Sequence, residues 1–182
     1  MFSAPKFGSR NRVHCDSRNQ SVWRSSGARA TLTELAFIAL GSNIDPETNL
    51  PLAAARLSEL GKPIAVSTVY QNPAIADEPQ PDYLNVAVLI ETALEPLKIR
   101  DKLRKIEADL GRIRTNDKDA PRTIDLDLCM LGDRVLDHEL LTLPDPDLLK
   151  RAHLAVTTAE LRPDFPHPLT GETLEEIANK LR

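Results

Sequence analysis

Apolar side chains along this chain follow two different spacings, which predict a mixture of strands and helices. Short apolar or β-branched runs that end at glycine, proline or asparagine predict strands. Longer stretches with apolar residues three or four positions apart predict amphipathic helices. These patterns predict strands at 35–40, 64–70, 83–91 and 123–131, and helices at 49–60, 96–110, 148–161 and from about 174 onward.

The order of the first six elements is strand, helix, strand, strand, helix, strand. This order predicts an α+β fold, a ferredoxin-like βαββαβ sandwich with additional C-terminal helices. Both central helices are expected on one face of the sheet, which leaves the opposite face free for a site. Pro51 is expected in the first turn of its helix, where a missing N–H costs least.

Composition and charge divide the chain into two parts. It has 182 residues, of which 41% are hydrophobic and 27% charged. No apolar run approaches the roughly 20 residues that a membrane-spanning helix needs. Residues 1–33 carry six basic residues against one acidic residue and show no apolar periodicity. We therefore expect a disordered basic N-terminal extension at 1–33 and a folded domain at 34–182.

The same features bear on location and partners. Cys15 and Cys129 are too few for a disulfide scaffold and indicate a reducing compartment. We expect a cytoplasmic monomer without a membrane partner. The alternative is import into an organelle, because the Arg- and Ser-rich composition of the extension is also that of a transit peptide.

The segment at 120–128, Ala-Pro-Arg-Thr-Ile-Asp-Leu-Asp-Leu, carries most of the candidate chemistry. Because side chains alternate along a strand, Asp125 and Asp127 are expected on one face, and the core face is expected to carry Ile124, Leu126, Leu128 and Met130. Two carboxylates this close repel each other unless a cation lies between them, and Mg²⁺ binds such carboxylates together with phosphate oxygens. The alternative is a solvated sheet face that carries two ordinary acids.

Three arginines, Arg112, Arg114 and Arg122, precede these acids in the sequence. Arginine recognises phosphate through several donors, and a metal ion with arginine commonly binds a polyphosphate. The alternative is that the arginines only pair with nearby acids such as Asp117 and Asp119. The combined spacing of acids and arginines favours the phosphate site.

The third predicted strand, 83–91, carries Tyr83 and Asn85 on one face. An Asn amide has paired donor and acceptor groups that suit the edge of a heterocycle, although a solvated Asn is the alternative. RNA-binding sheets share this strand order, but they need two or three aromatic side chains on the exposed strands. The acid-bearing strand has none, so we expect no nucleic-acid partner.

Four motifs are similar, in order and in spacing, to those of one enzyme family. They are Gly41-Ser42-Asn43; Pro73 with Gln80-Pro81-Asp82-Tyr83-Leu84-Asn85; Ile106-Glu107 with Leu110-Gly111-Arg112-Ile113-Arg114; and Pro121-Arg122-Thr123-Ile124-Asp125-Leu126-Asp127. From about residue 35 to 165 the chain resembles the 6-hydroxymethyl-7,8-dihydropterin pyrophosphokinases of folate biosynthesis. The resemblance implies transfer of pyrophosphate from the co-substrate ATP to the pterin hydroxymethyl oxygen, with two Mg²⁺ ions and with release of AMP.

The resemblance also implies roles for individual residues. Asp125 and Asp127 would bind the metal and act in catalysis together with Arg112 and Arg122. The residues implied for ATP are Glu107, Arg112, Arg114, Arg122, Leu128, Thr142 and Arg151. The residues implied for the pterin are Gly41, Asn72, Pro73, Ile75, Tyr83, Asn85 and His153.

Four positions depart from the family pattern. Asp119 stands where an aromatic residue closes over the site, and Leu140 where a basic residue contacts the nucleotide. Asp145 replaces a histidine, and His153 replaces a phenylalanine that stacks on the pterin. An acid such as Asp145 near the polyphosphate is expected to weaken ATP binding. The two aspartates expected to bind the metal, Asp125 and Asp127, are both present, which favours an active enzyme. The alternative is a catalytically weak pterin-binding or regulatory relative with an altered nucleotide site.

Overall fold

The computed structural model of this protein describes residues 33–74, 79–114 and 120–182. The expected N-terminal extension, apart from its last residue, lies outside the described residues, and so do Ile75 and Asp119. The first strand starts at Glu34, the position expected for the start of the domain.

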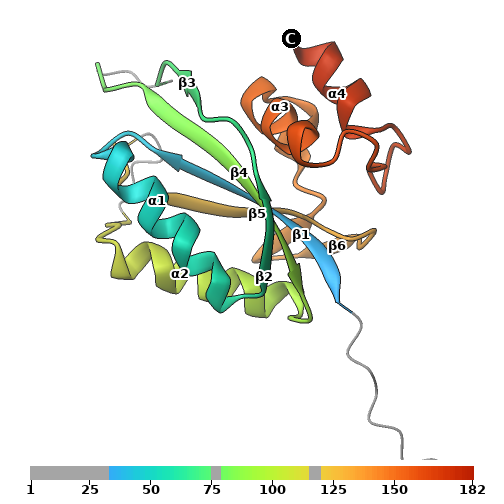
Figure 1. The fold of residues 1–182 in the computed structure, drawn as a ribbon, viewed down its shortest axis with the longest axis horizontal. Coiled ribbons are helices and arrows are strands. Elements are labelled where there is room, and N and C mark those ends of the chain that lie inside the picture. The colour runs from blue at the N-terminus through green and yellow to red at the C-terminus, as the bar shows by residue number, and fades with distance from the viewer. Residues whose placement is uncertain (1–32, 75–78, 115–119) are drawn as a thin grey trace, which may run out of the picture. The chain divides into compact units, whose positions relative to one another are not determined.

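An antiparallel sheet lies at the centre of the fold (Figure 1). Its strands are β1 (Glu34–Ser42), β2 (Lys62–Val66), β3 (Tyr70–Asn72), β4 (Tyr83–Thr92) and β5 (Asp125–Leu131). β1 lies between β4 and β5, and both β2 and β3 pair with β4. This arrangement confirms the predicted α+β fold of the ferredoxin-like type.

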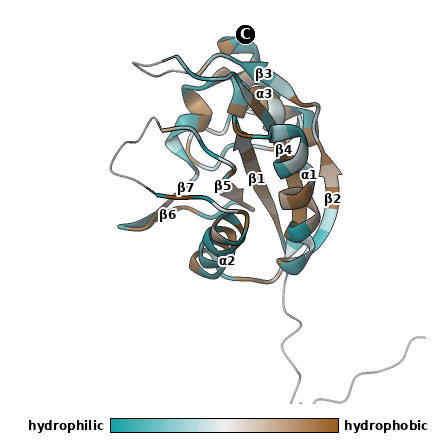
Figure 2. Ribbon diagram, turned by 90° about the vertical axis from the view of Figure 1, so that its left-hand side faces the viewer, coloured by the Kyte–Doolittle hydropathy of each residue, from teal (hydrophilic) through white to brown (hydrophobic). Residues whose placement is uncertain are grey.

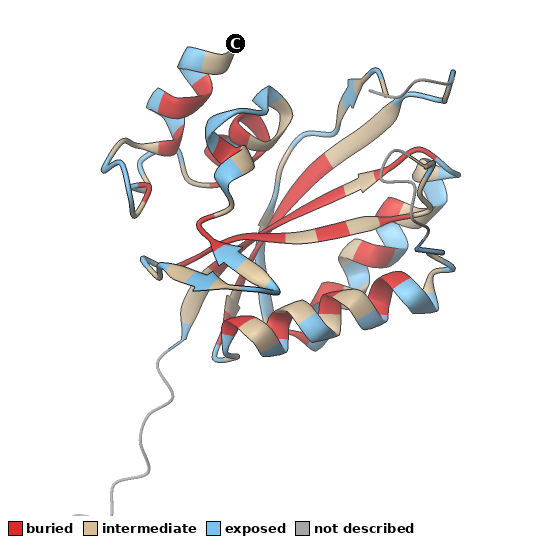
Figure 3. Ribbon diagram, turned by 180° about the vertical axis from the view of Figure 1, so that it is seen from behind, coloured by how far each residue is buried: buried red, intermediate tan, exposed pale blue. Residues whose placement is uncertain are grey.

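Helices lie on both faces of the sheet (Figures 1 and 2). They are α1 (Pro46–Arg56), α2 (Pro96–Asp109), α3 (Ala152–Leu161) and α4 (Leu174–Leu181). The stripe Ile99, Leu103 and Ile106 of α2 is buried in one core with Leu50 and Ala53 of α1. Buried residues follow the strands and the helix sides that face them (Figure 3), so the amphipathic pattern of the sequence predicted these helices correctly.

The sheet face opposite α1 and α2 is covered at one end only. There α3 and α4 pack in a second core with Phe37, Leu89 and Met130. Farther along the same face the strands carry Asn85 and Asp125, which line a cavity instead. The expectation of a free opposite face is therefore correct only for this polar end, because the apolar sides of the two C-terminal helices must also be buried.

Helix α1 begins three residues earlier than the predicted start at 49. Asp45, just before it, has a φ of 45°, and Pro46 occupies the first helical position, where its missing N–H is not needed. Pro51 therefore lies inside the helix rather than in its first turn. Its side chain is exposed, so the gap in the helical hydrogen bonds faces solvent.

The predicted strand at 64–70 is divided into β2 and β3. Between them, the Ser67 Oγ accepts a hydrogen bond of 2.9 Å from the Ala87 N–H, and the Ser67 N–H donates one of 2.9 Å to the Ala87 carbonyl. A side-chain oxygen thus replaces a backbone carbonyl in the ladder. Backbone pairing with β4 resumes at Tyr70.

Strand β5 departs from simple alternation after Leu128. The pairing of β1 with β5 shifts register between Phe37 and Ile38, as at a β-bulge. Cys129 and Met130 both lie in the core under the C-terminal helices. The prediction that Met130 shares a core with Leu126 is therefore wrong, whereas the alternation holds from Asp125 to Leu128 and keeps both acids on one face.

The chain after β5 contains more structure than expected. A hairpin of β6 (Leu136–His138) and β7 (Leu141–Leu143) follows β5. The predicted helix at 148–161 is a short 3₁₀ turn, Pro146–Leu149, followed by α3. None of the helices in the described ranges is long and apolar enough to cross a membrane.

Candidate active site

Small residues of β1 form the floor between the polar side chains of β4 and β5. Gly41 pairs with Asn85 on one side and with Asp125 on the other, and Ala39 pairs with Asp127. A Cβ atom at Gly41 would lie 3.0 Å from the Asn85 Oδ1. Glycine therefore leaves the space that the Asn85 amide occupies.

A cavity of about 770 Å³ opens above this floor. The residues expected around the pterin that line it are Gly41, Asn72, Pro73, Tyr83, Asn85 and His153. The residues expected at the metal or the phosphates that line it are Arg122, Asp125, Asp127 and Arg151. The structure thus gathers, from β1, β3, β4, β5 and the start of α3, residues that lie more than 100 positions apart in the sequence.

A second cavity, of about 220 Å³, adjoins the first at the acid-bearing strand. Leu128 and Thr142, both expected at the nucleotide, line it. Its walls combine apolar residues with charged ones; the apolar residues also include Leu103, Leu126, Leu140, Leu141 and Pro146, and the charged residues are Arg100, Arg104, Asp127 and Asp145. Asp127 and Asp145 line both cavities, so the two spaces meet at one of the acids that the sequence predicts to bind the metal.

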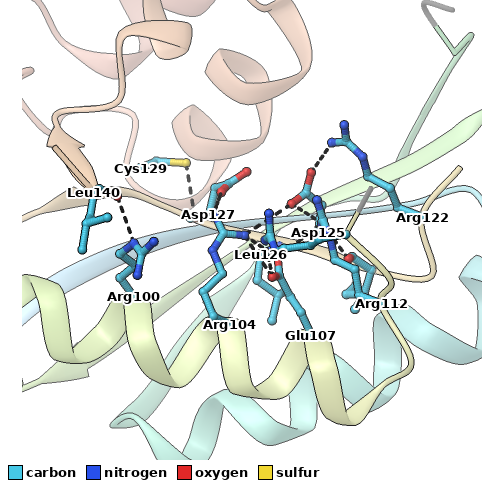
Figure 4. Close-up of polar contacts among 12 residues, drawn as sticks. Arg100, Arg104, Glu107, Arg112, Arg122, Asp125, Leu126, Asp127, Cys129 and Leu140 are labelled. Carbon is cyan, nitrogen blue, oxygen red and sulfur yellow. Dashed lines mark hydrogen bonds and ion pairs between the residues drawn. The ribbon is translucent and has the colours of Figure 1, made fainter. Parts of the chain in front are cut away.

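Asp125 is surrounded by cations. The guanidinium groups of Arg112 and Arg122 both donate hydrogen bonds to its carboxylate (Figure 4). Burial raises the pKa of Asp125, but these two guanidinium groups outweigh burial and hold the pKa below its usual value. Asp125 is therefore an anion at neutral pH.

Asp127 has less positive charge around it. Its nearest guanidinium contact is with Arg104, whose Nη2 lies 3.6 Å from the Asp127 Oδ1. Partial burial and the charge of Asp125 raise the pKa of Asp127 to about 7. A carboxylate in such a position gains strongly from a divalent cation, which also suppresses the repulsion from Asp125.

Two carboxylate donors fit a Mg²⁺ site that is completed by other ligands. Within residues 33–74, 79–114 and 120–182, no three His, Cys, Asp or Glu side chains are grouped to hold a metal ion. Mg²⁺ is often bound through one or two carboxylates, with the other positions filled by water and substrate phosphates. Asp125 and Asp127 fit that kind of site.

The raised pKa of Asp127 leads to a prediction for the metal-free protein. The folded state binds this proton more tightly than the unfolded state, whose Asp pKa is 3.8. Its contribution to stability is therefore complete below pH 3.8 and is lost as the pH rises to about 7. In EDTA, the melting temperature of Asp127→Asn minus that of the parent should increase from pH 5 to pH 8. A difference that does not change with pH would contradict the assignment.

Glu107 of α2 is the centre of an arginine cluster (Figure 4). Its side chain is 1% exposed and accepts hydrogen bonds from Arg104 at 2.9 Å, Arg112 at 3.3 Å and Arg114 at 2.6 Å. It also accepts one of 2.9 Å from the Leu126 N–H of β5. Glu107 lines neither cavity, and the same is true of Arg112 and Arg114. These contacts suit a residue that holds arginines beside the acid-bearing strand.

Asn43 and Ser42 connect the loops around the larger cavity. The buried Asn43 side chain accepts a hydrogen bond of 2.7 Å from the Arg122 N–H and donates to Gln80 Oε1 at 3.2 Å and to the Pro81 carbonyl at 3.3 Å. Ser42 Oγ donates to the Thr123 carbonyl at 2.6 Å. Asn43 therefore positions Arg122, a role that its place in a Gly-Ser-Asn turn did not reveal.

Comparison with known proteins identifies the family of this chain. A model of the family "7,8-dihydro-6-hydroxymethylpterin-pyrophosphokinase (HPPK)" matches residues 37–163. This chain belongs to the HPPK family. It is thus a pyrophosphokinase, and the resemblance found in the sequence is confirmed. HPPK enzymes use ATP as co-substrate and are generally Mg²⁺-dependent.

Individual HPPK relatives are similar over most of the folded part. A 2-amino-4-hydroxy-6-hydroxymethyldihydropteridine pyrophosphokinase of Haemophilus influenzae is 36% identical, covering 73% of this chain and 84% of its own. The protein of the same name from Synechocystis is 39% identical, covering 80% and 75%. A solved Plasmodium falciparum HPPK-DHPS structure shares the fold, with a TM-score of 0.62 and 15% identity over 82% of this chain. This chain spans 45% of that longer protein.

Three of the four positions that differ from the HPPK pattern are described. Leu140 is half exposed at the smaller cavity, and its carbonyl accepts a hydrogen bond of 2.9 Å from Arg100 Nε. Asp145 Oδ1 accepts one of 2.9 Å from the Asp147 N–H, and burial raises the pKa of Asp145. Burial and the charge of Arg151 lower the pKa of His153, which keeps a neutral ring at the larger cavity.

Proposed function

We propose that this chain transfers the terminal diphosphate of MgATP to the hydroxymethyl oxygen of 6-hydroxymethyl-7,8-dihydropterin and releases AMP. The observation that carries this proposal is the position of Asp127 in the walls of both cavities. An acceptor in one cavity and a nucleotide in the other would meet at the acids that can hold Mg²⁺. Such placement turns a reaction between two substrates into a reaction within one complex.

The larger cavity suits the pterin. Asn85 donates its amide N–H to Asn72 Oδ1, which orients the Asn85 amide beside Gly41. A fixed amide of this kind can pair with the donor and acceptor groups on the edge of a pterin ring. Tyr83, Pro73 and the neutral ring of His153 supply flat or apolar surfaces for the ring faces.

The smaller cavity suits the base end of ATP. Its volume of about 220 Å³ accommodates a base rather than a whole nucleotide, and its walls from Leu128, Leu140 and Leu141 are apolar. The phosphates would then extend past Asp127 toward Arg122 and Arg151 in the larger cavity. Asp145 lies on this path, so we expect weaker ATP binding than with a neutral residue there.

In the reaction, the pterin hydroxymethyl oxygen loses its proton to solvent and forms a bond to the β-phosphorus of ATP, and the bond from that phosphorus to the AMP oxygen breaks. Bound Mg²⁺, for which we propose two ions at Asp125 and Asp127, supplies charge neutralisation at the phosphates. Arg122 stabilises negative charge on the transferred group. Arg112 holds the Asp125 carboxylate in place, and Glu107 in turn holds Arg112.

The proposed enzyme acts as a cytoplasmic monomer on small molecules, without nucleic acid. The alternative of a catalytically weak pterin-binding relative rests on Asp145, Leu140 and His153. It is less favoured, because Asp125 and Asp127 are both present at the meeting point of the two cavities, and because the matched relatives are named as pyrophosphokinases.

The direct test is to incubate the purified chain with MgATP and 6-hydroxymethyl-7,8-dihydropterin and to quantify the products by chromatography. AMP and the pterin diphosphate should appear in equal amounts. Formation of ADP would contradict diphosphate transfer. Absence of both products at high substrate, with pterin still bound, would show the weak relative instead.

A substitution in the cavity floor tests the pterin assignment. In Gly41→Ala the new Cβ lies 3.0 Å from Asn85 Oδ1 and pushes the amide aside. We expect the KM for the pterin to rise by about tenfold, the effect of roughly one hydrogen bond, with the KM for MgATP nearly unchanged. In a protein that already carries Asn85→Ala, adding Gly41→Ala should raise the KM for the pterin only slightly further. A rise in the KM for MgATP alone would contradict the placement of the pterin.

A further inference from the structure

Arg104 contacts Asp127, and the sequence analysis did not single it out. It lies on α2, one helical turn before Glu107, and its side chain leans toward β5 (Figure 4). Its Nη1 donates to both Glu107 oxygens at 2.9 Å and lies 4.0 Å from Asp125 Oδ1. Its Nη2 lies 3.6 Å from Asp127 Oδ1. One guanidinium group thus contacts three carboxylates, two of which are the proposed metal ligands.

These contacts place a positive charge next to the atoms that a cation must reach. Arg104 reduces the electrostatic repulsion between Asp125 and Asp127, and a bound metal ion would have the same effect. Glu107 is almost completely buried and also paired with Arg112 and Arg114. It therefore anchors one side of the guanidinium group, while the other side is directed at Asp127, whose carboxylate is 47% exposed.

We propose that Arg104 is a positioning residue that acts as the counterion of Asp127 in the metal-free enzyme and must leave Asp127 before this carboxylate can bind a cation. The proposal rests on the proposed function, because it assigns a metal role to Asp127. Arg104 also lines the smaller cavity and contacts Asp127, past which the phosphates of the proposed nucleotide would run, so a phosphate can take over as its partner. The protein therefore has a low affinity for Mg²⁺ alone and a higher affinity for Mg²⁺ that is bound to the nucleotide.

The test uses Mn²⁺ as the metal, measured by electron paramagnetic resonance of the free ion, without nucleotide or pterin. Removing a neighbouring positive charge should favour the cation, so Arg104→Gln is expected to bind Mn²⁺ about tenfold more tightly than the parent. Arg104→Lys keeps a cation for Glu107, but one ammonium group cannot serve Glu107 and Asp127 together. Arg104→Lys should bind Mn²⁺ about threefold more tightly than the parent. It should also remain folded if Arg104→Gln does not.

Arg100→Gln is the matched control. Arg100 lies one turn earlier on α2 and lines the same smaller cavity, but its Nε donates to the Leu140 carbonyl and its Nη1 pairs with Asp101. Its loss should leave Mn²⁺ binding unchanged, which separates a direct contact from a general change of charge. A purely structural role of Arg104 would weaken the site rather than strengthen it.

Addition of ATP completes the test. In the parent, ATP should tighten Mn²⁺ binding, and this gain should be smaller in Arg104→Gln, whose Asp127 is already unpaired. Mn²⁺ binding to a folded Arg104 variant that is equal to or weaker than binding to the parent overturns the role of Arg104 and leaves the proposed function standing. Failure of the parent to bind Mn²⁺ even with ATP overturns both.

Discussion

Asp127→Asn is expected to lower kcat by at least about a thousandfold, because a neutral amide is a poor Mg²⁺ ligand and the lost charge stabilisation amounts to several kcal/mol. The fold should persist, since Asp127 is partly exposed and its charge is already unfavourable beside Asp125. Steady-state kinetics and thermal unfolding of the same preparation measure both effects.

Asp127 is a cleaner choice than Asp125 for this experiment. Loss of the Asp125 carboxylate would leave Arg112 and Arg122 without their shared partner. A suitable control is Asp147→Asn, since Asp147 lines the same cavity but pairs with Arg151 at 2.8 Å. The control should retain most of the activity. An Asp127→Asn protein that turns over at the parental rate would remove Asp127 from the metal site.

The second large effect is expected at Glu107, on stability. Glu107→Ala removes the buried acceptor that three guanidinium groups and the Leu126 N–H share, and Arg112 keeps only Asp125 and the Ile124 carbonyl among its described acceptors. Loss of one partner from a buried ion pair typically costs 3–5 kcal/mol, and Arg104 and Arg114 are partly exposed. We therefore expect the free energy of unfolding to fall by about 3 kcal/mol, as measured by urea denaturation.

Two further variants define what Glu107 contributes. Glu107→Gln keeps an acceptor for Leu126 but removes the charge, so its loss of stability should be intermediate. Glu59→Ala removes an exposed carboxylate that pairs with Arg56 on the surface and should leave the denaturation midpoint almost unchanged. If Glu107→Ala were as stable as Glu59→Ala, the buried cluster would not hold α2 against β5.

The sequence predicted the central elements of the fold well, for a physical reason. β1, β4 and β5 are apolar runs that end at turn residues, and α2 carries one apolar stripe at helical spacing, so their burial follows from these local patterns. The start of α1 and the division between β2 and β3 depend instead on single residues. The φ of Asp45 and the Ser67 side chain, which replaces a backbone carbonyl, leave no periodic signal.

The site was predictable to a similar extent. Alternation along β5 placed Asp125 and Asp127 on one face, as the structure shows. Arg104 was missed because an arginine on an amphipathic helix ordinarily belongs to the solvated face. A signal was present in its spacing, since Arg100, Arg104 and Glu107 recur on one side of α2 at intervals of four and three. Only the packing of α2 beside β5 shows that this side meets the acids.

Asn43 connects the segments that carry the two proposed substrate sites. Its one side chain bonds to the backbone that carries Arg122 and to the segment at Gln80 and Pro81, which leads into Tyr83. If pterin binding fixes the segment at Gln80 and Pro81, Asn43 therefore helps to fix the backbone at Arg122 as well. If the two substrates bind in different cavities as proposed, thermodynamic reciprocity requires that each raises the affinity for the other by the same factor.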